Sequence, residues 1–234
     1  AGTLPPSTSK TESWRTMPFS REWMVASLLY LFSPSVILLL CPGELWDLSR
    51  PLERDCIVEF LGKDQPESQE TLAHSSAHVL GQAIELFYSL PANHDLAEQS
   101  GERREPRVLL RDGPPTGQGG FYYDALILAP SPSSSFSSSS SVTSIGVSAD
   151  HLPGLAKLTS SFINSKHKFS RLVVSPQFAR QLFSYNPLKL NLIDKVEQLG
   201  EKLTMYRCGP FIDLCRGPHI PHTGRIGALE VLHS

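Results

Sequence analysis

The chain has 234 residues, of which 40% are hydrophobic, and a formal net charge of −2 from 21 basic and 23 acidic side chains. Its apolar content is enough for a packed core, which excludes a wholly disordered chain. A charge this close to neutral argues against nucleic-acid binding by bulk attraction, so such binding requires a local basic patch. The four cysteines are too few for a disulfide-built scaffold, which favours a reducing compartment.

The segment 1–42 contains the only strongly apolar run, MVASLLYLFSPSVILLLC at 24–41. The run is at the lower limit of a membrane-spanning helix, and Pro34 interrupts it, so no membrane partner is expected. The chain begins with Ala1, which is typical of a processed chain or a fragment. We leave 1–42 unassigned, as a targeting-like segment or one foreign to the fold behind it.

From Pro42 onward the pattern changes to that of a folded domain. The segment 43–63 predicts two strands around a polar turn, with Cys56, Val58 and Phe60 alternating on one apolar face. The sequence DQPE then marks a helix start, and apolar residues at three- and four-residue spacing predict a helix that ends at Pro91.

Further along, 108–128 predicts strand, turn and strand around a Pro/Gly-rich stretch. A run of serines follows, and we expect a disordered insertion at about 130–149. Beyond it the expected elements are a helix at 151–166, a strand at 168–175, a short helix at 178–185, a strand at 188–193, and strand–turn–strand at 205–234. Without regular βαβ alternation, this order predicts an α+β fold, with helices packed on a largely antiparallel sheet.

Two histidines lie four residues apart in HSSAH on the first predicted helix. Residues at this spacing share one helical face, so His74 and His78 are expected to point into one space. Gly81 follows on that face and is expected to leave a groove where a ligand approaches. The alternative is a pair of structural histidines that border the core.

A second motif, DLCRGPH, follows a predicted strand near the C-terminus. Alternation along that strand sends Asp213 and Cys215 to one side. A turn at Gly217-Pro218 would then bring His219 back toward Cys215. The alternative is a buried cysteine with an aspartate that caps a turn.

The two motifs together offer a His₃Cys set, a ligand combination that zinc accepts. With Asp213 the same groups form a set able to activate water or act as a nucleophile. The spacing leaves both interpretations open. The metalloprotease pattern HExxH is absent because position 75 is Ser.

Four segments stand out in order along the chain: HSSAHVLGQAIE, DGPPTGQGGFYYD, YNPLKLNLI and YRCGPFIDLCRGPHIPHTGRIGALEVL. They resemble the editing domain (second additional domain) of the threonyl-tRNA synthetase family. The preceding LWDLSRPLERDCIVEFL resembles the end of that family's small β-grasp (TGS-like) domain. The resemblance implies an editing domain at 64–234 after the β-grasp end at 43–63. LPGLAKLTSSF looks closer to the mitochondrial form, which implies the mitochondrial matrix, with the cytoplasm as the alternative.

The resemblance also implies the roles of individual residues. The hydrolytic pocket would be lined by His74, His78, Lys189, Asp213, Cys215 and His219. Substrate contacts are expected from Gly81, Tyr122, Tyr123 and Arg216. Related alanyl-tRNA editing domains hold zinc on the His/Cys set, so zinc is a candidate cofactor on His74, His78, Cys215 and His219.

The implied reaction is hydrolysis of the ester that joins serine to the terminal ribose of tRNA(Thr). Serine lacks one methyl group of threonine, a difference worth only about 1–3 kcal/mol of discrimination, so a second hydrolytic site is the physical remedy. His74, His78 or a bound hydroxide would activate water, Lys189 would assist the leaving oxygen, and Asp213 would hold the substrate's ammonium group. Cys215 and His219 would shape the site.

The expected partners are the acceptor end of tRNA(Thr) and the rest of a synthetase, usually a homodimer through its core. No segment before Ser234 resembles the class II aminoacylation core, so ATP binding and aminoacylation are not expected here. Phosphate contacts are expected from Arg103, Arg104, Arg107, Arg111, Lys166, Lys168 and Arg171. The alternatives are a zinc-stabilised structural module and a non-catalytic tRNA-binding module.

Overall fold

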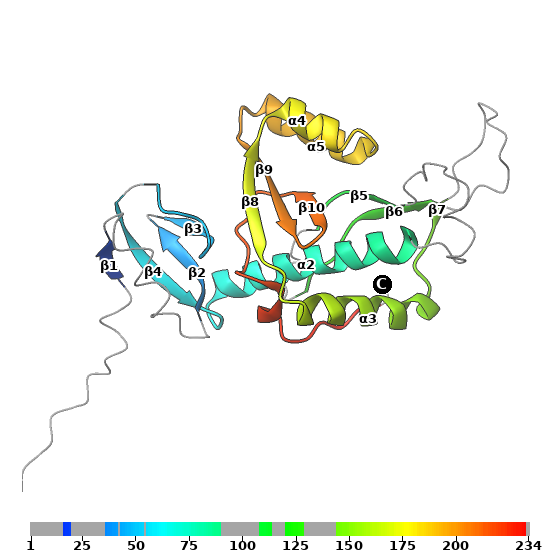
Figure 1. The fold of residues 1–234 in the computed structure, drawn as a ribbon, viewed down its shortest axis with the longest axis horizontal. Coiled ribbons are helices and arrows are strands. Elements are labelled where there is room, and N and C mark those ends of the chain that lie inside the picture. The colour runs from blue at the N-terminus through cyan, green and yellow to red at the C-terminus, as the bar shows by residue number, and fades with distance from the viewer. Residues whose placement is uncertain are drawn as a thin grey trace, which may run out of the picture. The chain divides into compact units, whose positions relative to one another are not determined.

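A computed structural model describes residues 16–19, 36–41, 43–53, 55–89, 108–113, 120–128 and 144–232 (Figure 1). The fold is α+β, with helices and antiparallel sheets, as the sequence predicted. The chain divides into two compact units, Ala1–Gln69 and Glu70–Ser234, slightly later than the expected boundary after residue 63. Among the helices of the described residues, none has the length and apolar content to span a bilayer.

The first unit is a four-stranded antiparallel sheet in the order β1-β4-β2-β3. Its core contains Trp46, Leu52 and Val58, with Cys56 and Phe60 against the same cluster, so the alternation predicted for this segment is confirmed. The strands are β1 (Thr16–Phe19), β2 (Val36–Cys41), β3 (Glu44–Trp46) and β4 (Cys56–Gly62).

The segment 1–42, which the sequence left unassigned, contributes β1 and β2 to this sheet. Both strands pair with β4, for example at Met17↔Val58 and Leu39↔Phe60. The apolar run at 24–41 therefore ends in a strand rather than in a helix. Pro34 disfavours a continuous helix, and the short apolar stretch after it suits a strand.

The second unit contains two three-stranded antiparallel sheets, in the orders β5-β6-β7 and β10-β9-β8. Their strands are β5 (Val108–Leu110), β6 (Ala125–Leu128), β7 (Ser144–Ile145), β8 (Phe169–Val174), β9 (Leu203–Cys208) and β10 (Phe211–Leu214). The expected disordered insertion is wrong in its last part, because β7 pairs with β6 and the short helix η2 (Ala149–His151) follows. The serine run at 131–141 lies outside the described residues.

Helices lie on both sides of the β8–β10 sheet (Figure 1). On one side α4 (Pro176–Leu182) and α5 (Pro187–Gln198) share a core with Leu203 and Met205 of β9. On the other side Phe211 of β10 joins the core formed by α2 (Pro66–Ser89) and α3 (Leu152–Asn164). The face of β9–β10 toward α2 carries the candidate site. A last short helix, η3 (Thr223–Arg225), follows.

The predicted strand at 188–193 is wrong, because these residues belong to helix α5. Alternation of Leu188, Leu190 and Leu192 suggested a strand. The helix forms because Asn186 caps its first turn and Pro187 occupies the first helical position. The buried positions Lys189 and Ile193 are then four apart, as one helical face requires.

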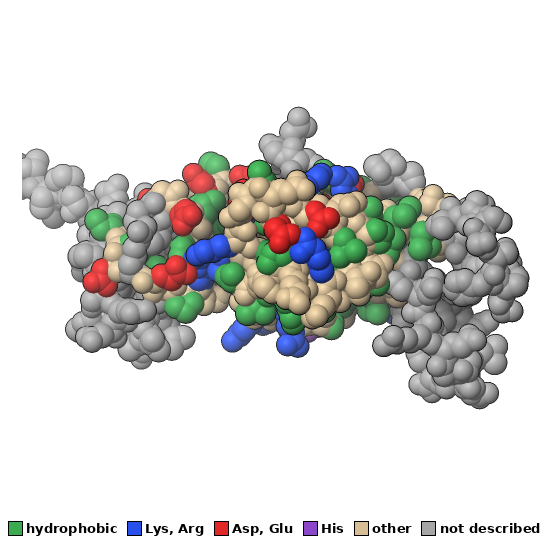
Figure 2. Space-filling view, turned by 90° about the horizontal axis from the view of Figure 1, so that it is seen from above, with side chains coloured by type: hydrophobic (Ala, Val, Ile, Leu, Met, Phe, Trp, Pro, Cys, Tyr) green, Lys and Arg blue, Asp and Glu red, His purple; other side chains and the backbone are tan. Residues whose placement is uncertain are grey.

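Acidic and basic side chains lie side by side on the exposed face of the α4–α5 pair (Figure 2). Arg180 of α4 bonds to Asp194 of α5 at 2.8 Å and also to Glu197. These ion pairs join the outer surfaces of the two helices, well away from their buried faces. Exposed pairs of this kind contribute little stability each.

Candidate active site

Helix α2 presents His74 and His78 one turn apart, with ring centroids separated by 5.2 Å. The segment after β10 brings two more groups to them. The Sγ of Cys215 lies 3.2 Å from Nε2 of His74 and 3.2 Å from Nε2 of His219. One ligand atom from each of these four residues lies within 4.8 Å of the others. We call His74, His78, Cys215 and His219 the His/Cys cluster.

The turn between Cys215 and His219 depends on Gly217, as the sequence predicted. Gly217 has a φ of +73°, a conformation that favours glycine, and a Cβ there would lie 2.1 Å from the hydroxyl of Tyr206. The Gly217 N–H donates to Sγ of Cys215 at 3.2 Å. The turn therefore both returns the chain to His219 and orients the thiol.

Ser75, which the sequence reasoning passed over, sets the tautomer of His219. Its fully buried hydroxyl donates its only proton to the carbonyl of Thr71 at 2.8 Å and accepts from the N–H of Ile220 at 3.2 Å. The contact of 3.0 Å to Nδ1 of His219 is then a hydrogen bond only if that nitrogen donates. Nε2 of His219 consequently faces Cys215 with a lone pair.

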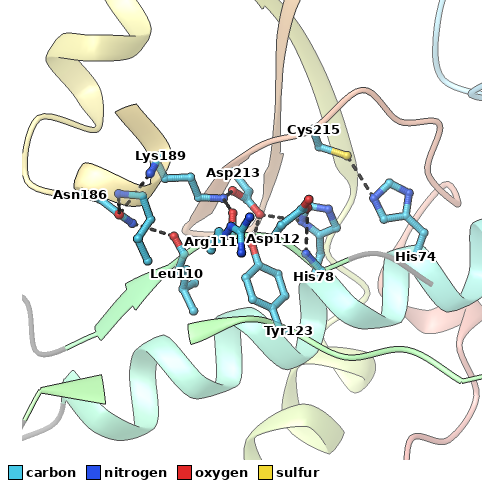
Figure 3. A network of polar contacts seen from close by, with 12 residues as sticks. His74, His78, Leu110, Arg111, Asp112, Tyr123, Asn186, Lys189, Asp213 and Cys215 are labelled. Carbon is cyan, nitrogen blue, oxygen red and sulfur yellow. Dashed lines mark hydrogen bonds and ion pairs between the residues drawn. The ribbon is translucent and has the colours of Figure 1, made fainter. Parts of the chain in front are cut away.

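Asp213 joins the cluster to a second group of polar side chains (Figure 3). One of its carboxylate oxygens binds Nζ of Lys189, and the other accepts the hydroxyl of Tyr123. The second oxygen also lies 3.4 Å from Nδ1 of His78. Lys189 and Asp213 are each 2% exposed, so this is a buried ion pair. The structure thus brings all six predicted pocket residues together.

Outside the Lys189–Asp213 ion pair, burial favours the uncharged forms of four groups of the site. Burial lowers the pKa of His78 to about 3, although the carboxylate of Asp213 opposes the shift. Burial likewise lowers the pKa of His219 well below its ordinary value, and it raises the pKa of the Cys215 thiol. The pKa of Tyr123 is well above its usual range, because of burial first and the nearby Asp213 second. Near neutral pH His78 and His219 are therefore neutral imidazoles, Cys215 is a thiol and Tyr123 is a phenol.

A cleft of about 370 Å³ opens beside the cluster. His74 and Cys215 line it, whereas His78, Lys189 and Asp213 are not among its lining residues. Aliphatic side chains form much of its wall, namely those of Leu192, Val196, Leu203 and Leu214. The polar part of the lining comes from Asp112, Lys202, Thr204 and Arg216. The cleft therefore offers an apolar surface next to the reactive groups.

Comparison with known proteins shows which proteins this chain is similar to. Residues 203–234, which contain Asp213, Cys215 and His219, match the family described as the threonyl and alanyl tRNA synthetase second additional domain. Over 221 residues, or 94% of the chain, the sequence is 36% identical to threonine--tRNA ligase 2, cytoplasmic, of Xenopus tropicalis. The chain is a homologue of the threonine--tRNA ligases.

Two human ligases show the same extent of similarity. Threonine--tRNA ligase 2, cytoplasmic, is 34% identical over 96% of the chain, and threonine--tRNA ligase 1, cytoplasmic, is 33% identical over 94%. Such long matches extend into the segment 1–42, in agreement with its two strands. The chain spans 22% to 25% of the length of these three ligases.

The residues expected to contact substrate lie in different settings. Tyr123 is buried and bonded to Asp213, whereas Tyr122 is 44% exposed. Arg216 lines the cleft and pairs with Glu201 at 2.7 Å. Of the basic residues, Arg111 pairs with Asp124 at 3.7 Å and Lys166 and Lys168 are exposed, while Arg103, Arg104 and Arg107 lie outside the described residues.

The groove expected beside Gly81 is filled, and that expectation is wrong. A Cβ at Gly81 would lie 2.6 Å from the ring of Tyr123, and a Cβ at Gly113 would lie 2.5 Å from the same ring. Both glycines therefore make room for Tyr123, which reaches Asp213 between them. Sequence spacing identified the small residue but not the side chain that occupies the space.

We predict that Gly81→Ala destabilises the chain by about 1–3 kcal/mol, because the buried ring of Tyr123 has no room to move. In an open helix the same change stabilises by about 1 kcal/mol, so the sign of the effect is diagnostic. Urea denaturation measures it. Gly146→Ala is the control, because no atom lies within 4 Å of its Cβ position. A stabilised Gly81→Ala variant would contradict this packing.

The donor set of the His/Cys cluster suits zinc. Ligand atoms around a tetrahedral zinc ion are separated by about 3.4–3.7 Å, which is close to the 3.2 Å contacts of Cys215. The outer contacts also suit a metal site: Ser75 holds Nδ1 of His219, and Asp213 lies next to Nδ1 of His78. The four residues present therefore fit the ion.

Proposed function

We propose that this chain carries an editing site that hydrolyses the ester of serine with tRNA(Thr). The observation that carries the proposal is the convergence of the His/Cys cluster with the Lys189–Asp213 pair beside an apolar cleft. The homology to threonine--tRNA ligases supports tRNA as the partner. Aminoacylation with ATP, dimerisation and the mitochondrial compartment stay predictions that concern the whole protein.

In this proposal the cleft receives the aminoacylated end of the tRNA. The terminal nucleoside packs against the aliphatic wall, and its ester lies at His74 and Cys215. Arg216 and Lys202, at the polar part of the lining, are placed to meet a phosphate. The exposed Lys166 and Lys168 are further candidates for contacts with the acceptor stem.

The reaction is attack of water on the carbonyl carbon of the ester. His74 accepts a proton from the water, the carbonyl-to-ribose bond breaks, and the ribose oxygen leaves with a proton that Lys189 donates or orients. His74 is preferred to His78 as the base, because the pKa of about 3 makes His78 a weak base. The protonated thiol of Cys215 is a poor nucleophile and serves to shape the site.

Asp213 receives a different role from the one expected. Both of its oxygens are engaged, one by Lys189 and the other by Tyr123. We therefore assign Asp213 to hold Lys189 in place rather than to bind the substrate's ammonium group.

Zinc bound at the cluster would supply a Lewis acid that lowers the pKa of a bound water. If all four residues of the cluster bind the ion, no coordination position remains for water, and zinc is then structural. This arrangement favours a second candidate function, a zinc-stabilised module without catalysis. Tightly held zinc together with an absence of deacylation would support that second function.

The test of the proposed function is hydrolysis of seryl-tRNA(Thr) by the 234-residue chain. We expect hydrolysis above the spontaneous rate, and hydrolysis of seryl-tRNA(Thr) faster than that of threonyl-tRNA(Thr), because the extra methyl group opposes entry to a close-fitting site. Assays with and without added zinc are run in parallel. A rate equal to that in buffer under both conditions would contradict the proposal.

A further inference from the structure

Asn186 is an almost fully buried amide, 1% exposed, whose two ends bond to different elements. Its Oδ1 accepts from the backbone N–H of Leu188 at 3.0 Å and of Lys189 at 3.3 Å, which caps helix α5. Its Nδ2 donates to the carbonyl of Leu110, at the end of β5, at 2.7 Å. One short side chain therefore fixes the start of α5 to β5 (Figure 3).

Lys189 makes the matching contact on the next residue of the same segment. Its Nζ donates to the carbonyl of Arg111 at 2.7 Å and binds Asp213. Leu110 and Arg111 are consecutive, so the amide and the ammonium hold α5 on two neighbouring carbonyls. A lysine side chain loses about 2 kcal/mol of rotamer freedom when it is fixed. The short asparagine already sets the position of the helix. The lysine side chain therefore has fewer conformations to sample before it reaches its two partners.

The geometry of the ammonium explains why this position matters. An ammonium group has three N–H donors. The bonds to Arg111 and Asp213 use two of them, and their directions fix where the third N–H points. A shift of α5 would redirect that third donor, and misplacement of about 1 Å at a reacting centre costs about 100-fold in rate.

We propose that Asn186 is the positioning residue of the site: by tying the first turn of α5 to Leu110, it fixes the ammonium of Lys189 between Arg111 and Asp213 and so sets the direction of its third N–H. This inference rests on the proposed function for its substrate, but the placement of Lys189 by Asn186 stands on the contacts alone. Asn186 itself touches no reacting atom.

The test separates the cap from the tie to β5. Asn186→Ser retains a good helix cap but is too short to bond to Leu110. We expect Lys189 in the folded chain to react about tenfold faster with an amine-acylating reagent, since one hydrogen bond is worth about tenfold in an opening equilibrium. Mass spectrometry reports the modified site, with the exposed Lys202 as the internal reference. For deacylation, we expect a lower kcat with little change in KM.

The control is Arg180→Gln, which removes the ion pairs on the exposed face of α4 and α5 and leaves the Asn186 end intact. Its Lys189 labelling should equal that of the wild type. Unchanged labelling in Asn186→Ser would overturn the inference, whatever the activity. If labelling increases in Asn186→Ser but the wild-type chain does not hydrolyse seryl-tRNA(Thr), the result supports the placement of Lys189 by Asn186. It then contradicts only the proposed function.

Discussion

Lys189→Met is expected to lower the free energy of unfolding by about 3–5 kcal/mol, because it leaves the buried carboxylate of Asp213 without its counter-charge. Asp213→Asn is expected to cost a similar amount, since it leaves the buried ammonium of Lys189 without a carboxylate. The double variant should cost clearly less than the sum of the two, because neither charge is then stranded. Urea denaturation of the four proteins gives the coupling energy directly.

The control for this cycle pairs Lys189→Met with Arg180→Gln. Arg180 lies on the outer face of the same helix pair and makes exposed ion pairs, so its removal should change stability little. The effects of these two changes should add. Additive effects of Lys189→Met and Asp213→Asn would mean that the two side chains do not interact in solution.

Acidification from pH 6.5 to pH 5 is expected to destabilise the chain strongly. The folded state holds the pKa of His78 at about 3 and that of His219 well below its ordinary value, whereas the unfolded state has both near 6.5. Between these values the unfolded state binds more protons, so stability falls as the pH falls. Two histidines contribute a slope of up to about 2.7 kcal/mol per pH unit.

The variant His78→Asn removes one of these two titrating histidines and so measures its contribution to the slope. As the pH falls, this variant should lose stability less steeply than the wild type does. The difference in slope should be up to about 1.4 kcal/mol per pH unit. Urea midpoints measured from pH 5 to pH 6.5, with a chelator present so that metal binding does not contribute, give both slopes. Equal slopes in the two proteins would show that His78 titrates alike in the folded and unfolded states.

The parts of the site that follow from local spacing were predictable from the sequence. The His74/His78 pair needs only helical periodicity, and the return from Cys215 to His219 needs only a glycine turn. Both arrangements are present in the structure. Short-range geometry of this kind depends on the backbone alone.

The parts that depend on contacts between distant segments were not predictable. Nothing in the sequence around Ser75 indicates a role for it. Its role follows only from its contacts with His219 and Ile220, which are distant in the sequence. Asn186 and Pro187 mark a helix start, but the leucine alternation after them favours a strand; the cap together with the packing of α5 against β9 decides for the helix. The space beside Gly81 looks open in sequence, because its occupant, Tyr123, arrives from another element.

The most direct test of the central claim is single-turnover hydrolysis of seryl-tRNA(Thr) by the full chain and by His74→Ala, each shown to be folded. A base that lines the cleft contributes about 10²- to 10⁴-fold to such a reaction. The account predicts a loss of that size in His74→Ala, with substrate binding largely kept. An unchanged rate in the folded variant would contradict the assignment of this cluster as a hydrolytic site.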